Sequence, residues 1–251
     1  MKSLTKAIAV ASLASVSTAA MAVEGLSTTI GLVSDYNYRG ESLGDAAANV
    51  SVDYSVGGFY VGVWAIDDGG EAAVDGLEYD TYLGWGGEVG GVEVGIGYTR
   101  YDYTYTSDYE SEINLSVGIA GFGLAIALGN DDNAATTSTS EELVATQDAS
   151  GNVTSITNVI TESAVPANDD DYTVIDLSYT NGAFGVLLGQ KSFDDADTEY
   201  KRFELSYSAE IGGADATATY GRVFDATVDS NDESSYGDDY LVFSLSKSFD
   251  L

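Results

Sequence analysis

Hydrophobic and polar residues alternate along most of the chain in stretches of about ten residues, and each stretch ends in a break. The pattern is clearest in segments 46–56, 92–99, 113–119 and 203–208. A period of two residues is the geometry of a β-strand, in which successive side chains point to opposite faces. No segment has apolar residues at convincing helical spacing, so the pattern predicts an all-β fold.

About twelve such strands are predicted, each near the length that a tilted membrane strand needs. They are expected to begin near Leu26, Ala46, Phe59, Leu77, Val92, Glu110, Phe122, Tyr172, Phe184, Tyr200, Ala216 and Asp239. An even number of strands fits a closed antiparallel transmembrane β-barrel whose two ends lie on the same side of the membrane.

The breaks between the strands alternate between two kinds. Short, Gly-rich breaks occur at 57–58, 86–91, 121, 181–182 and 211–215, and longer acidic segments occupy 35–45, 67–76, 101–109, 130–171, 191–199 and 225–238. This sorting is typical of an outer-membrane barrel with short periplasmic turns and long extracellular loops. A soluble β-sandwich is the alternative, but it gives no reason for the sorting.

Segment 130–171 is the longest of these loops and contains the only proline, Pro166. Its Thr-, Ser- and Asn-rich composition favours a surface loop without regular structure. A hairpin arm that includes Asn152–Ile160 is the alternative.

The two ends of the chain carry different signals. Residues 1–22 predict a cleaved signal peptide, with Lys2 and Lys6 before a short apolar run and an A-x-A site that ends at Ala22. The expected mature barrel is 23–251, and its first strand is expected to begin near Leu26. The last segment, 239–251, places apolar residues such as Phe249 on one face, as expected for a final strand that faces lipid and is recognised by the barrel-insertion machinery.

Several motifs resemble the TorF-like porin family of proteobacterial outer-membrane proteins. The S-D-Y-x-Y-R-G-x-S stretch of that family matches residues 34–42 here, and FYVGVW at 59–64 and EYD at 78–80 also fit its pattern. The chain ends in Leu251 rather than the terminal Phe common in such barrels, and segment 130–171 is longer than the family leads us to expect. The resemblance implies an outer-membrane β-barrel porin and no catalytic residues.

Composition narrows the chemistry. The 251 residues include no His and no Cys, and their formal net charge is −32. A phosphate-binding basic face for nucleic acid is therefore excluded, as are thiolate or imidazole metal ligands and the His-dependent catalytic sites of barrel enzymes. We expect no enzymatic activity, no cofactor and no bound metal.

The polar face of the strands predicts the residues that line the pore. They are Asp53, Glu78, Asp80, Glu93, Asp176, Arg202 and Glu204. Glu78 and Asp80 point the same way, and Glu93 on the next strand is expected nearby. A glycosidase-like carboxylate pair or a Ca²⁺ or Mg²⁺ site is the alternative to a charged pore lining.

Two further features bear on the barrel. Small inward residues, Gly62, Gly84, Gly95, Gly97 and Gly118, suggest a narrow opening. Aromatic belts are expected at both membrane interfaces. Their members would be Tyr36, Tyr38, Tyr98, Tyr101, Tyr103, Tyr200 and Tyr220 near the long segments, and Trp85, Phe122, Phe184 and Phe249 near the turns.

The sequence thus predicts a porin for small hydrophilic solutes or ions. The long segments and their neighbours hold 30 of the 41 acidic residues, with only Arg39 and Lys191 as bases, so we expect a preference for cations. A non-conducting barrel that displays its loops as an adhesin or receptor does is the alternative. Membrane lipid and lipopolysaccharide are the other expected partners, while the solute and the oligomeric state are left open.

Overall fold

The computed structural model describes residues 25–67, 76–133, 136–147, 153–165, 168–194, 199–227 and 239–251. The predicted signal peptide, residues 1–22, lies outside these ranges. None of the described residues belongs to a helix long and apolar enough to cross a membrane.

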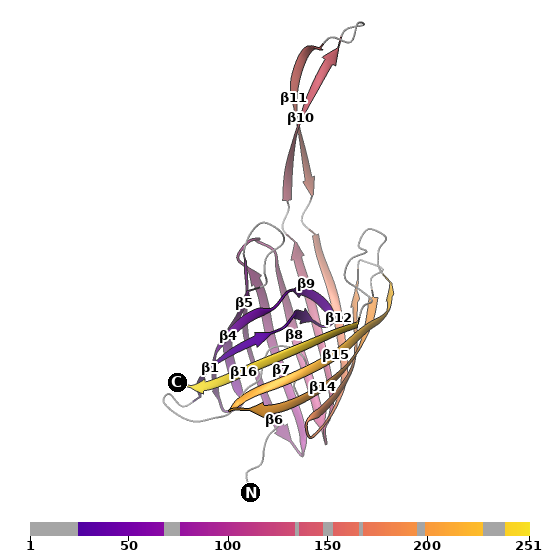
Figure 1. Cartoon of the computed structure of the whole chain (residues 1–251). Helices are drawn as coiled ribbons and strands as arrows, with labels where there is room; N and C mark the ends of the chain where they lie inside the picture. The colour runs from indigo at the N-terminus through magenta and orange to yellow at the C-terminus, as the bar shows by residue number, and fades with distance from the viewer. Residues whose placement is uncertain are drawn as a thin grey trace. The chain divides into compact units, whose positions relative to one another are not determined.

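Twelve antiparallel strands form a closed barrel, as the alternation of residues predicts (Figure 1). They are β1 (Leu26–Val33), β4 (Ala47–Val56), β5 (Phe59–Asp67), β6 (Leu77–Val89), β7 (Val92–Tyr103), β8 (Tyr109–Ile119), β9 (Phe122–Asn133), β12 (Asn168–Asn181), β13 (Phe184–Phe193), β14 (Glu199–Ile211), β15 (Ala214–Thr227) and β16 (Asp239–Asp250). The predicted starts agree closely with the observed ones, and the largest difference is at β12.

The barrel closes where its first strand meets its last. β1 pairs with β16 through seven residue pairs, including Thr28 with Phe249 and Leu32 with Leu245. The indigo β1 and the yellow β16 lie side by side in Figure 1. Closure leaves the barrel sheet without an open edge. An open sheet in a bilayer would have to expose such an edge to lipid.

Tight turns join the strands at the end of the barrel opposite the long segments. Gly58, Gly91, Gly121 and Gly213 all have positive φ, between 77° and 87°. Glycine adopts this conformation without the steric penalty of a Cβ atom. The break predicted at 86–91 is shorter than expected, because β6 continues to Val89.

The two faces of the sheet differ in polarity. Apolar side chains such as Ile30, Val61 and Leu241 point outward and are half exposed, whereas polar and charged side chains such as Asp176 and Arg202 are buried inside. A barrel of this polarity is suited to lipid outside and to water or charge inside.

The residues predicted for the aromatic belts are divided between the outside and the inside of the barrel. Phe122, Phe184, Phe249, Tyr98 and Tyr220 are exposed on the outside of the barrel. In contrast, the long-segment residues Tyr36, Tyr101 and Tyr200 are buried within it. A position near a strand end therefore does not show whether an aromatic side chain faces outward or into the barrel.

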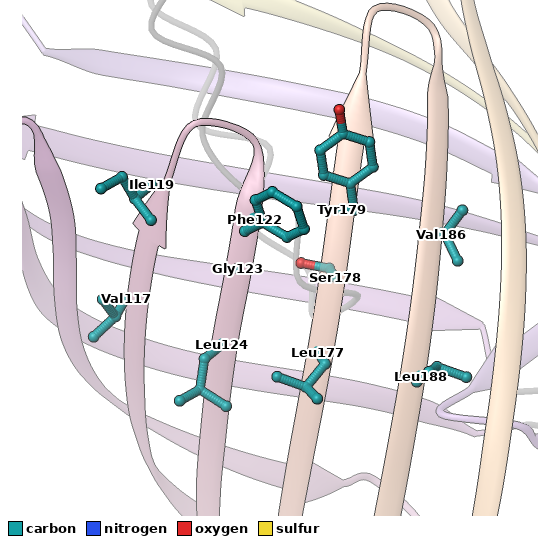
Figure 2. Close-up of a pocket in the computed structure, with 10 residues that line it drawn as sticks. All are labelled: Val117, Ile119, Phe122, Gly123, Leu124, Leu177, Ser178, Tyr179, Val186 and Leu188. Carbon is teal, nitrogen blue, oxygen red and sulfur yellow. The ribbon is translucent and has the colours of Figure 1, made fainter.

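A shallow apolar groove of about 460 Å³ runs over the outer face of β8, β9, β12 and β13. Figure 2 shows its lining side chains, among them Leu124, Leu177 and Leu188. The rings of Phe122 and Tyr179 meet at its turn end, with centroids 4.6 Å apart. The groove belongs to the outward-facing apolar surface of the barrel.

Residues 132–169 form a separate compact unit. Within it, β10 (Thr136–Gln147) and β11 (Val153–Val165) pair as an antiparallel hairpin, from Thr136 with Val165 to Gln147 with Val153. The favoured interpretation of this segment as an irregular loop was therefore wrong, and the hairpin alternative was right. The many Val, Ile and Thr residues of 153–165 favour strand conformation.

Deletion of Phe249–Leu251 tests the closure of the barrel. The deletion removes the pairs that β1 makes with Phe249 and Asp250, so unpaired backbone groups would remain at the seam. We expect the shortened protein to lose the heat-modifiable band of a folded barrel on gels. A deletion of equal length within 148–152, between β10 and β11, is the control and should leave that band in place. A heat-modifiable band in both variants would contradict the assignment.

Candidate pore constriction

A short hairpin between β1 and β4 folds into the barrel. It consists of β2 (Tyr36–Tyr38) and β3 (Glu41–Gly44). The turn between them is Arg39–Gly40, with φ values of 54° and 92°. Two successive positive φ values are the mark of a type I′ turn, which joins hairpin strands tightly. Segment 35–45 was predicted as a long loop; the structure shows that part of it is a regular hairpin directed into the barrel.

Tyrosines of the hairpin contact one wall of the barrel. The Tyr36 hydroxyl donates a hydrogen bond to Glu78 Oε2 of β6 (2.8 Å), and the Tyr38 hydroxyl lies 2.9 Å from that of Tyr101 on β7. Burial raises the pKa of the Tyr36 hydroxyl, and the Glu78 carboxylate raises it further. Tyr36 therefore stays protonated and serves as a donor.

The tip of the hairpin reaches β8. Arg39 donates through both terminal nitrogens to Glu112, with 3.0 Å between Nη2 and Oε2. The hydroxyls of Tyr101 and Tyr172 lie 3.0 Å and 2.9 Å from the two Glu112 oxygens. Arg39 and Glu112 are 4% and 1% exposed, so this is a fully buried, bidentate ion pair.

The other side of the hairpin contacts the opposite wall. Glu41 Oε1 accepts hydrogen bonds from Lys191 Nζ of β13 (3.1 Å) and from the Tyr200 hydroxyl of β14 (2.6 Å). A Cβ atom on Gly40 would lie 2.6 Å from Val223 Cγ2 of β15. The hairpin thus spans the interior from β6–β8 to β13–β15.

Three predicted pore-lining residues form one network beside the hairpin. Arg202, which is fully buried, donates from Nη2 to both oxygens of Asp176 (2.7 Å each) and from Nε to Glu204 Oε1 (3.2 Å). The Tyr240 hydroxyl also donates to Glu204 Oε1 (2.8 Å). The sole cation of the predicted set is therefore neutralised by Glu204 on its own strand, β14, and by Asp176 on β12.

Two other predicted residues differ in how their charge is satisfied. Asp53 accepts hydrogen bonds from the hydroxyls of Tyr82 and Ser51. Asp80 is only 1% exposed, and its carboxyl group is hydrogen-bonded to that of Glu78, two residues earlier on β6. Two carboxyl groups held together in a buried place are stabilised by a shared proton or by a nearby cation.

Glu93 does not lie near Glu78, contrary to expectation. In the β6–β7 pair, Glu93 faces Glu88 beside the turn, whereas Glu78 faces Tyr103 at the other end of the strands. The two-residue turn at Gly90–Gly91 fixes this register. The predicted pore-lining set is therefore divided between two levels of the barrel.

The inward glycines leave less space than expected. Added Cβ atoms on Gly84 and Gly97 would collide with the Tyr60 hydroxyl, and one on Gly62 with the Tyr82 ring. The rings of neighbouring residues occupy the room that the missing side chains provide. Over the part of the chain that the structure describes, no three acidic side chains are grouped so as to hold a metal ion.

The inward hairpin is what the sequence reasoning missed. Its strands have three and four residues, which is too few to show an alternation of apolar and polar positions. The usable signal was the Arg39–Gly40 pair directly after the tyrosines of β2, since glycine is common at the second central position of a type I′ turn.

Comparisons with known proteins identify a family and a fold. A model of a bacterial protein family of unknown function, Gcw_chp, matches residues 17–249. No curated protein sequence matches this chain. Among solved structures, one from work on the in-meso crystallization of membrane proteins is similar, with a TM-score of 0.50, 7% identity, and 90% of this chain and 84% of that chain covered.

Two further solved structures match this chain with lower TM-scores. The KdgM porin in complex with disordered oligogalacturonate has a TM-score of 0.45 and 6% identity, over 90% of this chain and 99% of that one. Acinetobacter baumannii OccAB3 has a TM-score of 0.43 and 7% identity over 88% of this chain. This chain spans 60% of the length of OccAB3. At these identities the likeness is one of fold alone.

Substitution of Gly40 by valine tests how the hairpin is seated. The valine would collide with Val223 and would hold a positive φ, which alone costs about 1–2 kcal/mol. In a Trp85→Phe background, which leaves Trp64 as the sole tryptophan, we expect the hairpin to leave its position. Trp64, whose ring lies 6.2 Å from that of Tyr36, then emits at longer wavelength and is quenched more readily by acrylamide.

Gly57→Val is the matched control, because Gly57 also has a positive φ but a Cβ atom there meets nothing within 4 Å. It should leave the Trp64 signal unchanged. Equal spectral changes in the two variants would mean that the Gly40 contact does not hold the hairpin.

Proposed function

The chain belongs to the Gcw_chp family, and we propose that it is an outer-membrane porin for small hydrophilic solutes or ions, with a preference for cations. The charged interior of a closed barrel with an apolar exterior is the observation that carries the proposal. We assign it no enzymatic activity. The resemblance of residues 34–42 to TorF-like porins, and a signal peptide at residues 1–22, accord with this role.

The charge of the constriction supports the cation preference. Seven acidic residues contribute to the hairpin and the wall around it, namely Glu41, Glu78, Asp80, Glu110, Glu112, Asp176 and Glu204. Three basic residues oppose them, namely Arg39, Lys191 and Arg202. A narrow passage with excess carboxylate concentrates cations and repels anions.

A non-conducting barrel is the second candidate, and one observation favours it. Side chains across the constriction are almost entirely buried, with exposures of 0% at Arg202 and 1% at Glu112 and Tyr200. A hairpin held this tightly fills the barrel at that level. Under this reading, the β10–β11 hairpin would be the element that engages a partner.

Reversal potentials in planar bilayers test the cation preference. We expect a cation-to-anion permeability ratio above one in a KCl gradient, larger at low ionic strength, because the Debye length shortens to about 8 Å at 0.15 M salt. The double variant Glu78→Gln/Asp80→Asn should move the ratio towards one, since it removes two of the seven acids.

Glu88→Gln/Glu93→Gln removes the same charge at the turn end and should have a smaller effect. An anion-selective or unselective wild-type channel at low salt would refute the preference. A protein that is correctly inserted but gives no current steps would favour the non-conducting barrel.

A further inference from the structure

We propose that Glu112 and its two tyrosines form a binding site for solutes that carry a guanidinium or primary ammonium group, and that the β2–β3 hairpin fills this site as an internal ligand. The inference rests on the proposed porin function and names the class of solute that it admits. Arg39 then marks where such a solute binds and also competes with it.

The site is built by the barrel wall rather than by the hairpin. Glu112 comes from β8, Tyr101 from β7 and Tyr172 from β12. A carboxylate offers about four lone-pair positions, and here two face the Arg39 nitrogens while two face the tyrosine hydroxyls. If the hairpin leaves, the tyrosines still orient Glu112, but its charge is unpaired. A planar, multiple N–H donor is the group that restores the lost pair of bonds.

The surroundings of Glu112 favour a cation over water. The Tyr172 hydroxyl also lies 2.9 Å from Glu110 Oε2, so a second carboxylate stands on the same strand. In the strand register, Asp80 faces Tyr101, and Tyr101 faces Glu110, which places Asp80 roughly 10 Å from Glu110 across two strand spacings. Asp80 is hydrogen-bonded to Glu78 on the same strand. The wall therefore places two pairs of acids, Glu78 with Asp80 and Glu110 with Glu112, on neighbouring parts of the barrel.

Arg39 itself has the features of a displaceable ligand. Its φ of 54° is a conformation that costs a non-glycine residue about 1–2 kcal/mol, and type I′ turns ordinarily place Asn, Asp or Gly there. Its Nε is buried and has no hydrogen-bond partner within the part of the chain that the structure describes. Strain at a conformationally unfavourable arginine, together with an unsatisfied donor, points to a residue kept for its contact with Glu112. An untethered guanidinium carries neither of these costs.

The β2–β3 hairpin makes a second contact that also covers the barrel wall. Glu41 pairs with Lys191, whose ammonium lies 4.7 Å from the Tyr172 ring centroid. When the hairpin is displaced, Glu78, Asp80, Glu110 and Glu112 face the lumen with Lys191 as the cation beside them. The vacated wall is strongly acidic and lined by tyrosine, which suits a cationic solute with N–H donors.

Binding of agmatine to the detergent-solubilised protein tests the proposal without any need for conduction. Agmatine carries a guanidinium at one end and an ammonium at the other. Arg39→Ala removes the internal ligand, so its apparent affinity for agmatine, measured by calorimetry, should be at least about tenfold higher than that of the wild type. Tetramethylammonium, which has no N–H donor, should not compete with it.

Two variants separate the site from general charge effects. Arg39→Ala/Glu112→Gln lacks both partners of the pair and should lose the gain in agmatine affinity. Arg222→Ala removes an arginine whose pair with Asp239 is largely exposed, and it should bind as the wild type does. A heat-modifiable band confirms that each variant is folded.

Equal agmatine affinity in wild type and Arg39→Ala would overturn the proposal, as would a gain that survives the loss of Glu112. These outcomes are independent of the porin assignment, which is judged by current steps in bilayers. Binding without conduction would support the site and refute the porin, whereas conduction without the predicted binding would do the reverse.

Discussion

Backbone amides at the edge of a sheet need hydrogen-bond partners, and the rest of the molecule depends on how this constraint is met. The seam between β1 and β16 satisfies it, because each of these strands would otherwise expose an unpaired edge. Once the sheet is closed, successive side chains point alternately outward and into the barrel. Apolar residues such as Leu32 and Leu245 face outward, and the polar ones must share an enclosed space.

That enclosed space explains why charge is paired so thoroughly inside the barrel. Arg202 is held by Asp176 and Glu204, and the tip of the β2–β3 hairpin brings Arg39 to Glu112. A buried carboxylate without a partner is strongly destabilising, so each cation that reaches the interior is matched to the acids around it. The excess of acids remains, and it gives the interior its negative character.

The sequence was informative where its pattern was long and periodic. Strands such as β4 and β16, with ten and twelve residues, repeat the two-residue period often enough to define both their extent and their outward face. The lumenal position of Asp176, Arg202 and Glu204 follows from the same parity, although their mutual contacts depend on the register between strands. The β2–β3 hairpin was not predicted because three or four residues are too few to show the two-residue period. Glu41 was also interpreted as a solvated charge in a loop. The predicted proximity of Glu93 to Glu78 was wrong for a related reason. The alternation of residues shows which face of the sheet a side chain is on, but not its height along the barrel axis.

The hairpin also connects parts of the chain that are made at very different times. Glu41 contacts residues 150 and 159 positions further on, Lys191 and Tyr200, although the hairpin follows directly after the first strand. Its seat is complete only when β13 and β14 have joined the sheet. Contacts of such long sequence separation form late because the closure of a long loop costs entropy before the contact repays it. We therefore expect the earliest residues of the barrel to be among the last to reach their final positions during folding.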